Sequence, residues 1–160
     1  MTAAQPEPAT KADFDQIVDR LADFWAERDV SALHHPMFID EFADGALVIR
    51  DADGAVAAYL FGLILPERRL GYVHVVAVRQ DQRGRGLARL LYERFGRLAR
   101  ERGCRRLKAI TTPGNAGSIA FHRGLGMEAV EVPDYSGPGR PRVVFSAELD
   151  AAGRPVRDPG

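Results

Sequence analysis

Two arginines and two glycines alternate at Arg83-Gly84-Arg85-Gly86, directly before a segment with helical periodicity. Glycine lets the backbone approach a ligand closely and point successive N–H groups at one place. The start of a helix carries partial positive charge, and the two arginine side chains add full charges. This combination favours a turn that binds a dianion such as a pyrophosphate.

Two other phosphate-binding patterns do not fit this turn. A nucleoside triphosphate loop ends in Gly-Lys-Ser/Thr, whereas this turn continues with Leu87 and Ala88. The dinucleotide pattern needs a third glycine where Arg89 stands. The alternative is an ordinary strand-to-helix turn, although Arg-Gly-Arg-Gly is an awkward start for a helix without a ligand.

The segment Val76–Ala88 resembles the acetyl-CoA signature of the GNAT N-acetyltransferase superfamily, written Q/R-x-x-G-x-G/A. The segment Asn115–Met127 resembles its second block, roughly N-x-x-A-x-x-F-Y-x-x-L-G-F. Together the two blocks give a resemblance over about residues 9–149. Asp81 stands where the signature has Gln or Arg, and His122 stands where the family usually has a tyrosine.

This resemblance implies acetyl-CoA as co-substrate, no metal, and direct transfer of the acetyl group to a primary amine in a ternary complex. It assigns the backbone of Val76 and Val78 to the pantetheine arm and the thioester carbonyl. It assigns Asn115 to the pantetheine arm as well. The pyrophosphate is expected on the backbone N–H groups of Arg83, Gly84, Arg85, Gly86, Leu87 and Ala88.

Two histidines are candidate catalytic residues. His74 shares one strand face with Val76 and Val78, because side chains alternate along a strand. Since histidine titrates near neutrality, His74 could take a proton from the amine. The family tyrosine is commonly proposed to protonate the leaving thiolate, so His122 is the candidate acid. The alternatives are a hydrogen-bonded strand histidine and a helix-surface histidine.

Two tyrosines are candidate substrate-binding residues. Tyr72 lies on the same strand face as His74, where some relatives carry a glutamate base. Tyr135 lies in the Pro/Gly-rich loop 133–141, which borders the acceptor site in relatives. A surface loop whose tyrosine covers the sheet edge is the alternative.

Three further residues are interpreted as structural. His34 and His35 are adjacent, point apart on a helix, and lack evident partners. Cys104, the single cysteine, follows a helix stop and precedes a strand, so a packed thiol is expected.

The order of elements predicts an α/β (α+β) fold: a single GNAT-like domain with a central mixed, mostly antiparallel sheet and helices on both faces. A capping box of Thr10 and Asp13 starts the first helix. Residues 1–8 are expected to be a flexible lead-in or edge strand, 9–149 the domain, and 150–160 a disordered tail. The elements expected are helices from Thr10 through Trp25 and over 31–42, 86–102 and 118–125, and strands over 46–50, 55–65, 71–78, 106–111, 127–132 and 142–149.

The overall composition limits the partners. Twenty-two basic and 22 acidic residues cancel, so no global field favours nucleic acid or an anionic membrane. Without a signal-like start or a long apolar run, a cytoplasmic protein is expected, and a homodimer is possible. Two other classes stay open: a non-catalytic acyl-CoA-binding regulatory module, and a structural interaction domain without a cofactor.

Overall fold

A capping box starts the first helix, α1 (Lys11–Asp19). The Thr10 hydroxyl accepts a hydrogen bond from the Asp13 N–H, and the Asp13 carboxylate accepts one from the Thr10 N–H, as predicted. Arg20 ends α1, and α2 (Leu21–Trp25) follows as a separate short helix. The single continuous helix predicted from Thr10 through Trp25 is therefore wrong, because Arg20 interrupts the helical backbone.

The computed structural model describes residues 4–157, and the chain divides into two units. The N-terminal unit holds the residues up to Ile64 together with Val73–Phe95. The C-terminal unit holds Leu65–Tyr72 together with the residues from Gly96 onward. Each unit combines β-strands with packed helices, which confirms the predicted α/β class. The predicted domain boundaries at residues 9 and 149 stay a prediction.

The N-terminal unit contains strands in the order β1-β2-β3-β4. The pairs β1–β2 and β2–β3 are antiparallel. Gly54 lies in the turn between β2 and β3 with a φ of 83°, the left-handed conformation for which glycine is needed. The strands are β1 (Glu7–Pro8), β2 (Ala46–Arg50), β3 (Val56–Leu65) and β4 (Leu70–Val78), and the ends of β3 and β4 nearest their connection belong to the C-terminal unit. Of the predicted lead-in, residues 1–3 lie outside the described part, and β1 is the edge strand.

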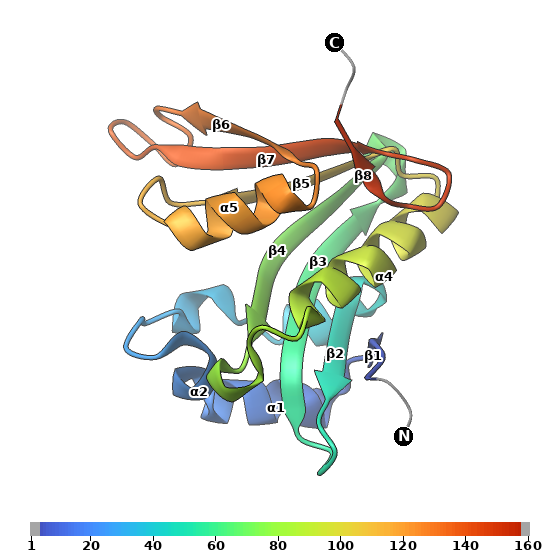
Figure 1. Ribbon diagram of the computed structural model, residues 1–160, viewed down its shortest axis with the longest axis vertical. Helices are drawn as coiled ribbons and strands as arrows, with labels where there is room; N and C mark the ends of the chain where they lie inside the picture. Colours follow the sequence, from blue (N-terminus) through green and yellow to red (C-terminus); the bar gives the residue numbers. More distant parts are fainter. Residues whose placement is uncertain (1–3, 158–160) are drawn as a thin grey trace. The chain divides into compact units, whose positions relative to one another are not determined.

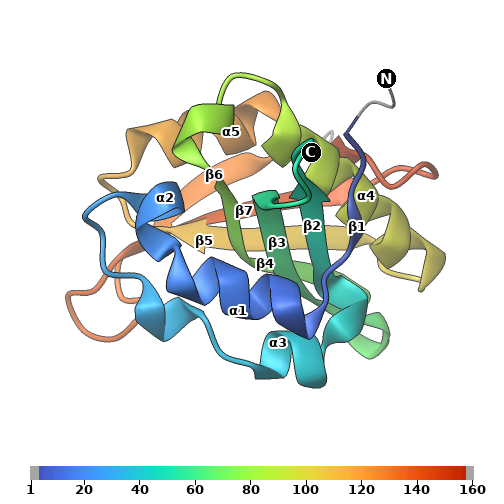
Figure 2. The same ribbon diagram turned by 90° about the horizontal axis from the view of Figure 1, so that it is seen from below.

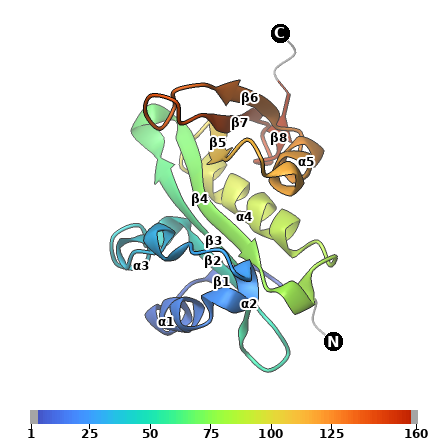
Figure 3. The ribbon, with the colours of Figure 1, turned by 90° about the vertical axis from the view of Figure 1, so that its left-hand side faces the viewer.

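Helices cover both faces of this sheet. Figure 2 shows α1, α2 and α3 (Met37–Asp40) together over β2–β4. Figure 3 shows the first part of α4 (Leu87–Glu101), which up to Phe95 belongs to this unit, on the opposite side. Burying β2 and most of β3 on both faces explains their nearly continuous apolar sequence. The core on the α1–α3 side contains Phe14, Ile17, Phe24, Phe38, Ala46, Val48, Val56, Tyr59, Phe61, Val75 and Ala77.

The predicted helix over 31–42 is only partly present. A 3₁₀ turn, η1 (Ser31–Leu33), and the short α3 take its place. Pro36 directly precedes α3, and its missing N–H prevents one continuous helix from passing through it.

The C-terminal unit contains a second group of antiparallel strands. The central strand β7 (Arg142–Leu149) pairs with β5 (Arg106–Thr111) on one side and with β6 (Glu128–Val132) on the other. The helix α5 (Ala116–Gly124) packs against this group, as Figure 1 shows. The tail is also ordered in part, since β8 (Pro155–Val156) pairs with β7. The predicted disordered tail is therefore wrong for this segment, and residues 158–160 lie outside the described part.

A close backbone contact in the C-terminal unit requires two glycines. A Cβ added to Gly96 of α4 would lie 2.1 Å from the carbonyl oxygen of Gly153. We expect Gly96→Ala to lower the free energy of unfolding by ~1–3 kcal/mol, the usual range for overpacking, despite the better helix propensity of alanine. Chemical denaturation measures this. Gly117→Ala in α5, where a Cβ meets nothing within 4 Å, is the control and should not destabilise. Equal stability of the two variants would contradict the contact.

No helix among residues 4–157 combines the length and the apolar character that crossing a membrane requires.

Candidate functional site

The glycine turn has two residues in the left-handed region of backbone conformation. Gly84 and Gly86 have φ values of 79° and 75°, which disfavour any other residue. A Cβ added at either position would meet nothing within 4 Å, so the space beside the backbone is open. The helical hydrogen bonds of α4 begin with the Leu90 N–H donating to the Gly86 carbonyl. N–H groups of the first helical turn, such as those of Leu87 and Ala88, have no acceptor inside the helix and suit an anion.

Arg79 holds the chain in place just before this turn. Its guanidinium donates to Asp81 Oδ1 at 2.6 Å, to Asp51 Oδ2 at 2.8 Å and to the Val56 carbonyl at 3.0 Å. The hydrogen bonds from Arg79 lower the pKa of both carboxyls, and the two carboxylates raise the pKa of Arg79. Asp81, which departs from the family signature, therefore has a structural partner at the entrance to the turn.

The two arginines of the turn contact protein groups of their own. Arg83 Nη2 donates to the Phe24 carbonyl at 3.0 Å, at the end of α2. Arg85 Nη1 donates to Gln82 Oε1 at 2.6 Å. These contacts stabilise the turn conformation. That either arginine adds charge to a bound pyrophosphate stays a prediction.

Strand β4 shows the predicted alternation. Val73, Val75 and Ala77 are buried, while the intervening side chains, among them Val76 and Val78, are only half-buried. The strand leads directly toward the glycine turn, so the predicted pantetheine and pyrophosphate positions follow one another along the chain. The positions on β4 and in the turn belong to the N-terminal unit.

His74 lies half-buried on the same strand. Its Nε2 is 2.9 Å from the Leu33 carbonyl oxygen, and its ring stacks on Phe38 with 4.5 Å between centroids and 18° between planes. A carbonyl only accepts, so Nε2 carries the proton and Nδ1 keeps a lone pair in the neutral ring. Burial lowers the pKa of His74, partly offset by the bond to Leu33. The ring is thus neutral near pH 7 and can accept a proton.

The remaining predicted residues belong to the C-terminal unit. Asn115 is the N-cap of α5: its Oδ1 accepts from the Ser118 N–H at 3.2 Å, and its Nδ2 donates to Thr111 Oγ1 at 3.1 Å. The helix therefore begins two residues before the predicted Ser118. Asparagine is a preferred N-cap, a signal that also favours this earlier start.

His122 is buried, with 4% of its surface exposed. Its Nδ1 donates to the Ser118 carbonyl at 2.8 Å, and its ring stacks on Phe145 with 3.9 Å between centroids and 3° between planes. Burial lowers the pKa of His122, partly offset by the bond to Ser118. The expected alternative of a helix-surface histidine is therefore wrong, because this face of α5 packs on β7.

The structure brings the two predicted substrate-binding tyrosines together. Tyr72 and Tyr135 share a hydrogen bond, and burial together with Tyr135 raises the pKa of Tyr72 to about 12. Tyr135 is 46% exposed, at the base of a loop that Asp134 stabilises by accepting the Gly139 N–H at 2.9 Å. A partly exposed phenol pair can hydrogen-bond a ligand and cover its apolar part.

Of the residues interpreted as structural, His34 and Cys104 are packed into the protein, whereas His35 is exposed. His34 contacts Val30 and Tyr59, which corrects the expectation that it lacks partners. Cys104 is buried, and burial raises the pKa of its thiol, so it is no ready nucleophile.

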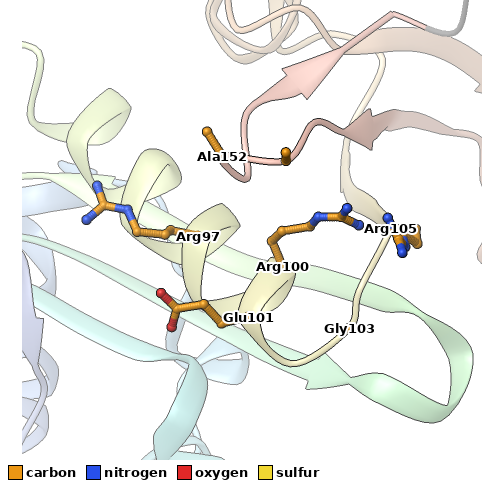
Figure 4. Close-up of a pocket in the computed structure, with 7 residues that line it drawn as sticks. Arg97, Arg100, Glu101, Gly103, Arg105 and Ala152 are labelled. Carbon is orange, nitrogen blue, oxygen red and sulfur yellow. The ribbon is translucent and has the colours of Figure 1, made fainter.

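Other surface features do not coincide with the predicted residues. One hollow of the C-terminal unit is lined by the end of α4 and the turn after β7, and Figure 4 shows Arg100 pointing toward Arg105 there. A second hollow lies over β5, β6 and β7. Neither contains a predicted site residue. Within residues 4–157, no cluster of three or more His, Cys, Asp or Glu side chains could hold a metal ion.

Comparison with known sequences identifies the class of protein to which this chain belongs. The sequence pattern of the acetyltransferase (GNAT) family matches residues 14–127, and the chain belongs to this family. It is 35% identical over 127 residues to an L-methionine sulfoximine/L-methionine sulfone acetyltransferase of Pseudomonas paraeruginosa, covering 76% of this chain and 74% of the relative.

Solved structures agree with this assignment in their fold. Ard1 from Thermoplasma volcanium superposes with a TM-score of 0.76 at 18% identity, covering 92% of this chain and 98% of that one. The structure of yncA from Salmonella typhimurium, solved with its cofactor acetyl-CoA, has a TM-score of 0.69 at 23% identity, covering 93% and 95%.

Proposed function

We propose that this protein is an N-acetyltransferase that moves the acetyl group of acetyl-CoA to a primary amine by direct transfer in a ternary complex. The observation that carries the proposal is the turn at Gly84 and Gly86, with two positive φ values and open space at the start of α4. Membership of the family supports the same reaction. Backbone N–H groups of residues 83–88 would hold the pyrophosphate, and β4 at Val76 and Val78 would hold the pantetheine arm.

The reaction needs two proton transfers. The amine nitrogen bonds to the thioester carbonyl carbon, the C–S bond breaks, the nitrogen loses a proton and the thiolate gains one. His74 can accept the amine proton, because its neutral ring has a lone pair on Nδ1. We assign the thiolate proton to His122, which must then carry a proton on Nε2, since Nδ1 donates to Ser118.

For the acceptor, we propose a small α-amino acid or a close analogue, with Tyr72 and Tyr135 among its contacts. The support is the relative named for L-methionine sulfoximine and L-methionine sulfone. An amine panel that includes both compounds, amino acids, polyamines and peptides tests this by following the release of free CoA thiol. A clear preference for a peptide N-terminus would rule out an amino acid as the acceptor and make the peptide the acceptor in its place.

Acetyl-CoA should stabilise the protein. A ligand that binds only the folded state at ~100 times its dissociation constant adds roughly 2.7 kcal/mol to the free energy of unfolding. We expect a matching rise in the melting temperature with millimolar acetyl-CoA, measured by differential scanning calorimetry. Pantetheine alone, which lacks the pyrophosphate, is the control and should give a smaller rise. No shift with acetyl-CoA would remove the cofactor assignment.

One observation favours a second candidate, a non-catalytic acyl-CoA-binding module. His122 occupies the position of the family tyrosine but is buried and hydrogen-bonded within its own helix. This candidate predicts a thermal shift with acetyl-CoA and no thiol release with any amine of the panel.

A further inference from the structure

A chain of polar groups crosses the core of the N-terminal unit. Trp25 Nε1 donates to Tyr59 Oη at 2.8 Å, Tyr59 Oη lies 2.7 Å from His34 Nε2, and His34 Nδ1 lies 2.9 Å from the Val30 carbonyl. The indole can only donate and the carbonyl can only accept. The consistent arrangement therefore has Tyr59 donating to Nε2 and a neutral His34 donating from Nδ1.

This series of hydrogen bonds anchors the surface segment that follows Val30. No residue of η1 is buried, so apolar packing does not fix this 3₁₀ turn. The Val30 carbonyl accepts from both His34 Nδ1 and the Leu33 N–H at 2.9 Å, which ties the two ends of the turn together. The ring of His34 packs edge-on against Tyr59, with 5.6 Å between centroids.

The anchored segment presents one backbone group to β4. The Leu33 carbonyl, between Val30 and His34, accepts the Nε2 proton of His74. The face of the His74 imidazole stacks on the ring of Phe38, which belongs to the same core as Tyr59. The ring plane of His74 and the position of its proton are thus both set by groups outside β4.

We propose that His34 is a positioning residue: held by Tyr59 and Val30, it sets the Leu33 carbonyl so that His74 keeps its proton on Nε2 and its lone pair on Nδ1. The catalytic meaning of this arrangement rests on the proposed function, in which His74 is the base. The arrangement itself is independent of any reaction. The lowered pKa values of both histidines agree with two neutral rings.

The test uses the full-length protein and the ring nitrogens of His74. Two-bond ¹H–¹⁵N correlation spectra at a pH where His74 is neutral report its tautomer, and solvent exchange reports the protection of its Nε2 proton. In the wild type we expect the Nε2–H tautomer and slow exchange. His34→Ala should raise the Nδ1–H fraction several-fold and expose the Nε2 proton. Tyr59→Phe, which keeps the ring and removes only the hydroxyl, should act in the same direction.

Two further variants separate positioning from general damage. His34→Asn keeps a side-chain N–H that can reach the Val30 carbonyl, and we expect it to restore much of the wild-type tautomer. His35→Ala changes the neighbouring exposed histidine, whose Nδ1 accepts a hydrogen bond from the Met37 N–H, and should leave the His74 signals unchanged.

These experiments separate the positioning role of His34 from the proposed role of His74 as the base. A wild-type tautomer and wild-type exchange in His34→Ala would overturn the positioning role, whatever the activity. If the tautomer shifts as expected but His74→Ala keeps the wild-type pH profile, the positioning role is supported and the base role in the proposed function fails.

Discussion

Gly86→Glu is expected to abolish acetyl-CoA binding while the protein still folds. The new side chain would project from the backbone that is proposed to hold the pyrophosphate, and its carboxylate would repel the phosphates. At a φ of 75° a non-glycine residue costs ~1–2 kcal/mol. A Cβ there meets no other atom within 4 Å, and a carboxylate at a helix N-terminus is itself favourable, so the fold should survive. Calorimetric titration with acetyl-CoA measures the loss.

Gly54→Glu is the matched control for this variant. Gly54 has a φ of 83° and equally open surroundings, but it lies in the turn between β2 and β3. The same substitution therefore introduces the same charge and a similar strain away from the glycine turn. We expect a comparable fall in melting temperature and unchanged binding of acetyl-CoA. If Gly86→Glu also bound normally, the phosphates would lie elsewhere.

Features that depend on neighbouring residues could be predicted from the sequence. The capping box at Thr10 and the turn at Gly84 and Gly86 are both set within a few residues. The strand and helix around the glycine turn follow from their own periodicity in the same way. The part of the candidate site that lies in the glycine turn could therefore be predicted from the sequence alone.

Features that depend on distant residues could not be predicted. The bond from His74 uses the backbone carbonyl of Leu33, and no side-chain pattern indicates which carbonyl a histidine will meet. The short β8 pairs with the end of β7 at Glu148 and Leu149, beyond the stretch of β7 that β6 covers. Burial of His122 depends on Phe145, a residue of another strand. Each of these is a tertiary contact, which local propensity does not encode.

The two histidines should give the reaction a bell-shaped pH profile. The base, His74, acts when deprotonated, so the rate rises with pH through its pKa. Burial lowers that pKa, and the rising limb therefore lies below the ordinary value of 6.5. The acid, His122, acts when protonated, so the rate falls as pH rises through its pKa. Burial lowers this pKa too, which places the falling limb below 6.5 as well. We expect an acidic optimum for kcat/KM with the preferred amine, because this parameter reports the titration of the free enzyme.

Substitutions assign each limb to its residue. His122→Phe keeps an aromatic ring on Phe145 but removes the proton donor, and we expect turnover to fall by roughly 10²-fold or more with little change in acetyl-CoA affinity. His122→Tyr restores the usual family residue and should keep much of the activity, with the falling limb displaced upward in pH because a phenol titrates near ~10. His74→Ala should flatten the rising limb. His35→Ala, outside both proposed roles, should keep the whole profile.

A plateau at high pH in the wild type would contradict the acid role of His122, because a neutral imidazole whose Nδ1 proton is held by Ser118 has no second proton to give. Wild-type turnover of His122→Phe would lead to the same conclusion, and water or the attacking amine itself would then supply the proton to the thiolate. Slow product release could hide the chemical step in kcat. Single-turnover rates across the pH range separate these cases, since they report bond breaking before CoA leaves.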